Sequence, residues 1–241
     1  MNRLLILLLS TGLLKVCAEP SSGIISNRSQ SEPEEKTFQW ENAIKQSFAF
    51  LALEHTIRLS QAKTRNEFGG KFFPDYFASV SNIRGWGDGD SIFTNYVGHP
   101  MQGAITGFIQ IQNDPSGKYV DFGNSKEYWQ SRLKAMAWSA AYSTQFEIGP
   151  ISEATIGNVG KRSGTAGAVD LVVTPTAGIG LAIAEDAIDH YFVAKLEAKA
   201  SSRFSRILIR SALNPNRTMA NILRWKVPWH RDSRPGVSEL P

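Results

Sequence analysis

Apolar residues recur along most of the chain at the three- and four-residue spacing of amphipathic helices. Between residues 37 and 68 this pattern is sustained, with Thr37 as a suitable N-cap and Gly69-Gly70 as a stop signal. Further helices are predicted over residues 72–83, 91–112, 125–146, 152–159, 169–199, 203–213 and 215–225. Few segments alternate with a period of two, and no repeat of fixed length occurs. The sequence therefore predicts an all-α fold, a compact bundle of about six to eight helices.

Glycine and proline residues mark the interruptions of this pattern. The glycine-rich segment 85–90 is expected to be a loop, and residues 160–167 a flexible link. The helix that contains His99 should be interrupted beside Pro100. Pro175 should either kink the longest helix or lie in its first turn.

The first eighteen residues have the pattern of a secretory signal peptide. Arg3 precedes an apolar run from Leu4 to Leu14, and Val16-Cys17-Ala18 fits the small-x-small cleavage rule. The run is too short to span a bilayer of about 30 Å, which argues against an uncleaved anchor. Cleavage after Ala18 would remove the single cysteine, so the expected chemistry excludes thiol nucleophiles, cysteine-ligated zinc and disulfides.

The sequence accordingly divides into four parts. Residues 1–18 are the predicted signal peptide, and residues 19–36 are a polar leader expected to be disordered. Residues 37–225 are predicted to form a single helical domain, followed by a tail over residues 226–241. We expect an exported protein that is periplasmic or associated with the outer membrane.

Composition excludes several classes of protein. Of the 241 residues, 42% are hydrophobic and 20% are charged, which is close to the globular average and unlike collagen or a fully disordered chain. A mean hydropathy of −0.21 argues against a polytopic membrane protein. The formal net charge of +4 is too small to indicate a nucleic-acid partner, and none is expected.

Two of the predicted helices carry stripes of small residues. These are Gly98, Gly103, Ala104 and Gly107 in one helix, and Ala177, Gly178, Gly180, Ala182 and Ala184 in the other. Small residues let helix backbones approach closely, as they often do in membrane bundles. The alternative is tight packing in a soluble or peripheral bundle.

Asp88 and Asp90 lie in the glycine-rich loop over residues 85–90. Two carboxylates on such a loop could bind a hard cation, although the spacing is not that of an EF-hand. The alternative is a helix N-cap loop, in which Asp90 or Ser91 accepts hydrogen bonds from the first free amides.

His99 lies within the first small-residue stripe, and its expected partners are Glu147, Glu153 and Asp170. A buried histidine can be a general base or a ligand, or it can serve packing through hydrogen bonds to a carboxylate or the backbone. His99, Glu147 and Asp170 are therefore the candidate catalytic residues.

A second acidic group lies on the longest predicted helix and comprises Glu185, Asp186, Asp189 and His190. Members four residues apart share a helix face, so this group could hold one divalent ion. It lacks the H-E-x-x-H pattern of zinc hydrolases, and the alternative is a solvated face.

Residues 203–231 carry basic side chains and no acid. Arg203, Arg206 and Arg210 share one face of a predicted helix, opposite apolar side chains. A basic amphipathic helix suits an anionic membrane surface or lipid, which is the expected partner. The alternative is a helix packed on the domain with its basic face in solvent.

Several of these residues also carry a resemblance. The segments concerned are WGDGD at 86–90, NYVGHPMQG at 95–103, QFEIGP at 145–150 and DLVVTP at 170–175. They look like those of an uncharacterised bacterial envelope protein family, over most of residues 40–230. They are also remotely similar to VanZ-like helical proteins, which usually have an Asn in place of Thr174. The resemblance implies a helical bundle in which His99, Glu147 and Asp170 converge, and it implies no known reaction.

The sequence thus predicts an exported helical protein of the bacterial envelope with a structural or lipid-interacting role. In that hypothesis a hydrogen-bonded triad of His99, Glu147 and Asp170 fixes the register of the helices. The alternative is a hydrolase that acts on a lipid or cell-wall substrate, with His99 as the general base. Neither hypothesis requires a cofactor or a metal ion, and none is predicted.

Overall fold

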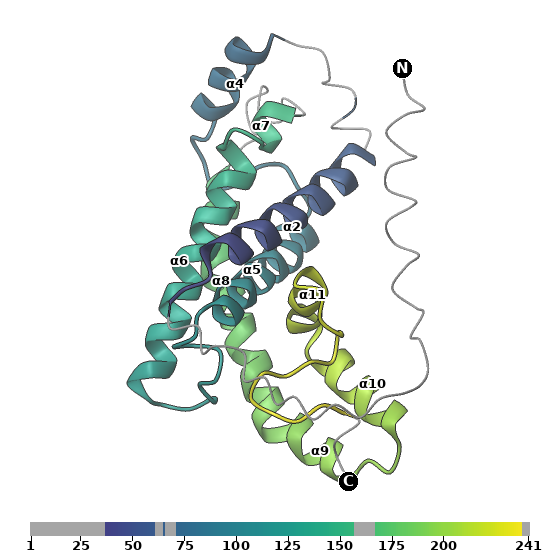
Figure 1. Ribbon diagram of the computed structural model, residues 1–241. Helices are drawn as coiled ribbons and strands as arrows, with labels where there is room; N and C mark the ends of the chain where they lie inside the picture. The colour runs from purple at the N-terminus through teal and green to yellow at the C-terminus, as the bar shows by residue number, and fades with distance from the viewer. Residues whose placement is uncertain (1–36, 61–64, 66–70, 157–166, 238–241) are drawn as a thin grey trace. The chain divides into compact units, whose positions relative to one another are not determined.

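The computed structural model describes residues 37–60, 65, 71–156 and 167–237, which form helices and loops without a strand (Figure 1). The helices are α2 (Trp40–Ser60), α4 (Phe72–Ser81), η2 (Thr94–Gly98), α5 (His99–Asn113), α6 (Lys126–Ile148), α7 (Glu153–Ile156), α8 (Val169–Ile188), η3 (Asp189–Val193), α9 (Ala194–Lys199), α10 (Arg203–Leu213) and α11 (Pro215–Leu223). The all-α helical prediction is confirmed. The predicted signal peptide, the leader and most of the predicted link over 160–167 lie outside the described residues.

Helix α5 is the central element of the bundle. Every residue of α5 except Met101 is buried, and the helix packs against α6 and α8 with α2 and α11 alongside (Figure 1). Phe108 and Ile109 are fully enclosed there. Burial on all sides explains why this segment is rich in small and apolar residues rather than amphipathic.

The two predicted stripes of small residues meet where α5 crosses α8. A Cβ atom added at Gly103 would lie 1.8 Å from the carbonyl oxygen of Thr174, and one added at Gly178 would lie 2.6 Å from the Cα of Gly103. The two backbones are therefore in direct contact, which only glycine permits at these positions. Gly180, two residues after Gly178, has nothing within 4 Å of an added Cβ.

One helix among the described residues, Val169–Lys199, is long and apolar enough to cross a membrane. It comprises α8, the π-helical turn η3 and α9, so the long predicted helix is continuous. Pro175 lies inside α8 beyond its first turn. The core helices of soluble proteins pass the same test of length and hydropathy, and Val173, Thr174 and Gly178 are buried within this bundle.

A π-helical turn also accounts for the predicted interruption at Pro100. The turn η2 runs directly into α5, and Pro100 is the second residue of α5, so the helical hydrogen-bond pattern changes beside Pro100 without a break in the helix. Elsewhere, Ser125 caps α6 as predicted: its hydroxyl accepts a hydrogen bond of 3.1 Å from the backbone N–H of Tyr128.

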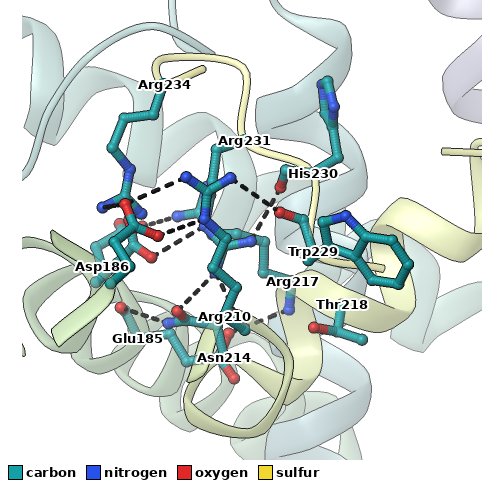
Figure 2. A network of polar contacts seen from close by, with 12 residues as sticks. Glu185, Asp186, Arg210, Asn214, Arg217, Thr218, Trp229, His230, Arg231 and Arg234 are labelled. Carbon is teal, nitrogen blue, oxygen red and sulfur yellow. Dashed lines mark hydrogen bonds and ion pairs between the residues drawn. The ribbon is translucent and has the colours of Figure 1, made fainter. Parts of the chain in front are cut away.

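The acidic group on α8 lies in a network of ion pairs (Figure 2). Asp186 accepts hydrogen bonds from the guanidinium groups of Arg132 and Arg217, and from the hydroxyl of Tyr128. Glu185 accepts from the backbone N–H of Arg217, 3.1 Å away. Both expectations for this group, a solvated face and a site for a divalent ion, are therefore wrong, because arginines neutralise it internally.

The segment predicted as a tail also belongs to this network. Arg231 and Arg234 both pair with Asp189, and Arg231 donates to the side-chain oxygen of Asn214 at 2.9 Å (Figure 2). Arg231 is buried, as is Val237. The folded domain therefore extends past residue 225, because the arginines of this segment form ion pairs with Asp189.

Candidate functional site

The structure brings together the three residues proposed as catalytic. One ligand atom each from His99, Glu147 and Asp170 lies within 4.8 Å of the other two. His99 begins α5 directly after the π-helical turn, Glu147 lies in the last turn of α6, and Asp170 lies in the first turn of α8. Three helix ends thus meet at one point.

His99 is held in one orientation by groups on its Nδ1 side. Its Nδ1 lies 3.1 Å from Oε1 of Gln102 and 3.3 Å from the hydroxyl of Thr174. Because Nε2 of Gln102 donates to Glu54, Oε1 of Gln102 must be an acceptor, and Nδ1 of His99 carries the proton. Burial lowers the pKa of His99, so the ring is neutral and Nε2 has a free lone pair.

The atoms that face the centre of the cluster have no hydrogen bonds. Nε2 of His99 lies 3.0 Å from Oδ1 of Asp170, but the two are not aligned for a hydrogen bond. Oε1 of Glu147 is buried beside them. None of these three buried atoms has a hydrogen-bond partner among the described residues. Such atoms are rare in native proteins because each costs about 1–3 kcal/mol of desolvation.

The cluster is crowded with carboxylates. Burial raises the pKa of Glu147 well above its ordinary value, and the charges of Glu153 and Asp170 raise it further. Burial, together with the charge of Asp88, raises the pKa of Asp170 to about 8. Negative charge is therefore in excess at this point, and it must be balanced by protons or by a cation.

Arg58 on α2 is the cation that faces this cluster. It donates to Asp90 at 3.1 Å and forms a close ion pair with Glu153. These two carboxylates engage its charge, which also acts on Glu147 and opposes the rise in the pKa of that carboxyl.

Asp88 and Asp90 do not form a separate cation site. Oδ1 of Asp88 accepts hydrogen bonds from the side chain of Asn95 and the backbone N–H of Asp90, while Asp90 pairs with Arg58. The hydroxyl of Ser91 accepts from the N–H of Thr94, as a helix cap does. This segment is thus a helix N-cap loop, which was the alternative interpretation. The cation that pairs with Asp90 is the guanidinium of Arg58.

A cleft of about 230 Å³ opens beside His99. Its lining residues are Glu54, Ile57, Arg58, Thr94, Gly98, His99, Gln102 and Phe146. Glu54, Arg58 and Gln102 are functional candidates that the sequence did not single out. A signal existed, because Glu54 and Arg58 are charged residues four apart on one face of a largely apolar helix.

Glu54 has the environment of a proton acceptor. Its Oε2 accepts hydrogen bonds from the hydroxyl of Tyr142 at 2.6 Å and from the amide of Gln102 at 3.2 Å. Burial raises the pKa of Glu54 to about 7, which those hydrogen bonds only partly oppose. A carboxyl with this pKa exchanges protons readily near neutral pH.

Apolar side chains stand beside the cleft. Ile57 lines it and is half exposed, and the exposed Phe93 and Val97 are neighbours in sequence of the lining residues Thr94 and Gly98. Exposed apolar residues next to a polar centre suit a substrate that has both an apolar and a polar part.

The arginines predicted to face a membrane lie differently. Arg210 is fully buried and paired with Glu197 of α9, and Arg206 is buried with its Nε donating to the carbonyl of Ala200 at 3.1 Å. Only Arg203 of the three is exposed. The prediction that the basic face of α10 points outward is therefore wrong. This face packs against the protein, because the buried carboxylate of Glu197 on α9 pairs with Arg210.

The outer face of α10 is apolar instead. Phe204 is 72% exposed and Leu208 is 54% exposed. Lys195, Lys199 and Arg203 are exposed nearby in the sequence. An apolar face with flanking cations remains compatible with an anionic membrane surface, but different residues would make the contact.

Comparison with known proteins supplies no further assignment: no family model, no curated protein and no solved structure matches this chain.

Proposed function

We propose that the protein is a hydrolase of the bacterial envelope and that its active centre is the cleft beside His99. One observation carries the proposal: the buried His99 lines a cleft, and its Nε2 has no hydrogen bond among the described residues. An unsatisfied lone pair at such a position is costly unless the protein uses it.

The hypothesis of a purely structural triad is less well supported. A buried polar network rigidifies a core only when its members are fully hydrogen-bonded. His99, Glu147 and Asp170 each keep a buried atom without such a bond among the described residues. Partial satisfaction is expected of groups that await a ligand.

The cleft contains the groups that hydrolysis requires. A water molecule in the cleft can give its proton to His99 or to Glu54 while its oxygen attacks a carbonyl carbon or a phosphorus atom. The bond from that atom to the leaving-group oxygen then breaks, and the same base returns the proton to that oxygen. The guanidinium of Arg58, which also lines the cleft, can stabilise the negative charge that develops on the attacked group. A positioned general base accelerates such a step by about 10² to 10⁴-fold.

The substrate class follows from the surroundings of the cleft. The exposed Ile57, Phe93 and Val97 favour a lipid or another amphiphile over a fully polar molecule. A membrane-facing location agrees with the apolar outer face of α10, and export agrees with the pattern of residues 1–18. Fractionation into soluble, inner-membrane and outer-membrane pools tests this location.

Turnover of chromogenic substrates tests the activity. The full chain is assayed with p-nitrophenyl butyrate and with bis(p-nitrophenyl) phosphate, each in the presence of phosphatidylglycerol vesicles. His99→Asn and Glu54→Gln should each lower kcat/KM by at least about 100-fold. His55→Gln is the matched control, because His55 is buried on α2 against Phe146 and does not line the cleft. The proposal fails if neither substrate is turned over, or if His99→Asn retains the wild-type rate.

A further inference from the structure

We infer that His99, Glu147 and Asp170 bind a divalent transition-metal ion, with Nε2, one Glu147 oxygen and one Asp170 oxygen as ligands. The inference deepens the proposed function, since it assigns a metal ion to that same cleft.

The spacing of the three atoms fits a metal centre. Zinc and similar ions bind imidazole nitrogen and carboxylate oxygen at about 2.0–2.2 Å, so ligands on adjacent coordination positions lie about 3 Å apart. Nε2 of His99 and Oδ1 of Asp170 are separated by 3.0 Å. All three atoms lie within 4.8 Å of one another, so small side-chain rotations bring Glu147 to the same ion.

The free lone pairs are an independent observation. Nε2 of His99, Oε1 of Glu147 and Oδ1 of Asp170 are each buried without a hydrogen bond among the described residues. His99 is 5% exposed and Asp170 is 2% exposed, so solvent does not satisfy these side chains. Three of the buried unsatisfied atoms thus belong to the three residues whose ligand atoms lie within 4.8 Å of one another, as expected if an ion binds there.

The outer contacts of His99 are those of a metal ligand. A histidine that binds a metal through one ring nitrogen usually donates the other N–H to a fixed acceptor, which sets its tautomer and orientation. Gln102 supplies that acceptor at 3.1 Å, and it is itself fixed by its hydrogen bond to Glu54.

A bound cation would also balance the negative charge of the cluster once its carboxyl groups are ionised. Glu147 and Asp170 face one another, with Asp88 beside them. Arg58 is engaged with Asp90 and with Glu153. A divalent ion would compensate the carboxylates of Glu147 and Asp170. A ligand set of one imidazole and two carboxylates favours Zn²⁺ or Mn²⁺, because Mg²⁺ and Ca²⁺ prefer sites made of oxygen atoms alone.

A bound ion also distinguishes the two proton acceptors of the cleft. Coordination uses the lone pair of His99, so Glu54 is the group that accepts protons in the loaded protein. His99, Glu147 and Asp170 would hold the ion, and His99 is the one of the three that also lines the cleft. The ion itself supplies Lewis acidity toward a bound water or a substrate oxygen.

Zinc binding by the chelator-stripped full chain, prepared without a histidine tag, tests the inference. Equilibrium dialysis should show stoichiometric Zn²⁺, weaker Mn²⁺ and negligible Mg²⁺ binding. Glu147→Gln and Asp170→Asn keep the side-chain shape and should each weaken Zn²⁺ binding by at least about 100-fold, more than loss of an outer contact usually costs. The matched controls are His55→Gln and Glu185→Gln, a buried histidine and a buried carboxylate outside the cluster.

A thermal-shift measurement keeps the test decisive when a variant is unstable. Zn²⁺ should raise the melting temperature of the wild-type chain and of both controls, but not that of Glu147→Gln or Asp170→Asn. Zinc binding that survives in both cluster variants, or no stoichiometric binding by the wild type, overturns the inference. Zinc binding without turnover contradicts the hydrolase proposal alone, and chelator-resistant turnover without zinc binding contradicts the metal site alone.

Discussion

Replacing Gly103 with alanine tests whether the contact between α5 and α8 positions the candidate site. The new Cβ would lie 1.8 Å from the carbonyl oxygen of Thr174, and an ordinary contact at this point is at least 3.4 Å. A backbone carbonyl cannot rotate away as a side chain can, so α8 must move outward by about 1.6 Å.

The magnitude combines two effects of opposite sign. Forced overpacking of a core costs about 1–3 kcal/mol, and a backbone clash belongs at the upper end of that range. Alanine in a helix gains about 1 kcal/mol over glycine. We therefore expect Gly103→Ala to lower the free energy of unfolding by about 2 kcal/mol, or the melting temperature by about 4–8 °C for a chain of this size.

Gly180→Ala is the matched control. It is also a glycine-to-alanine change in a helix, α8, but nothing lies within 4 Å of the new Cβ. It should stabilise the protein by about 0.5–1 kcal/mol. Both variants are compared by urea unfolding followed by circular dichroism. Zinc binding should also weaken in Gly103→Ala, since Thr174 contacts Nδ1 of His99 at 3.3 Å. Equal stability of the two variants would refute the claim of direct backbone contact.

Three further predictions concern pH, charge and backbone strain. Because the pKa of Glu54 is raised from 4.5 to about 7, its contribution to stability is full below pH 4.5 and is lost as the pH rises through 7. In urea unfolding of the metal-free protein over this range, Glu54→Gln should therefore lose about 3 kcal/mol less than the wild type, whose fall also includes the raised pKa values of Glu147 and Asp170. Arg210→Met removes one of the two arginines that pair with the buried Glu197 and leaves only Arg234; it should cost about 3 kcal/mol in thermal unfolding, whereas Arg203→Met should change stability by less than about 0.5 kcal/mol. Trp225 has a φ of 59° and is 87% exposed, so Trp225→Gly should stabilise the protein by about 1 kcal/mol; an equal gain from Trp225→Ala would contradict an origin in the left-handed backbone.

Local sequence signals predicted the helical part of this fold well. The hydroxyl of Ser125 caps α6, and the small residues around Gly103 and Gly178 form the closest helix contact described. Both features can be read from the local sequence. A cap acts within three residues, and a stripe of small residues indicates that another helix packs closely against it. His99 and Asp170 likewise lie close together because α5 and α8, the helices that carry them, pack against each other.

Long-range charge compensation could not be predicted in the same way. The basic face of Arg206 and Arg210 has the pattern of an exposed surface, yet Glu197 turns it inward. The separation of apolar and basic residues on a helix shows that its two faces differ in polarity, but it does not show which face is buried. Glu54 was overlooked for a related reason, since its partners Gln102 and Tyr142 come from helices 48 and 88 residues away in the sequence.

The ion pairs of α8 have a consequence for the order in which the chain can fold. Asp186 and Asp189 are neutralised by arginines that follow them by 31 to 45 positions, and Asp186 also pairs with Arg132. While the chain emerges from the ribosome, Asp189 therefore lacks its arginines, and Asp186 has only Arg132, until residues 217–234 have been synthesised. Early docking of α8 is penalised, because an unpaired carboxylate resists burial. The bundle around α8 should therefore close late in synthesis, once the arginines of residues 217–234 are available.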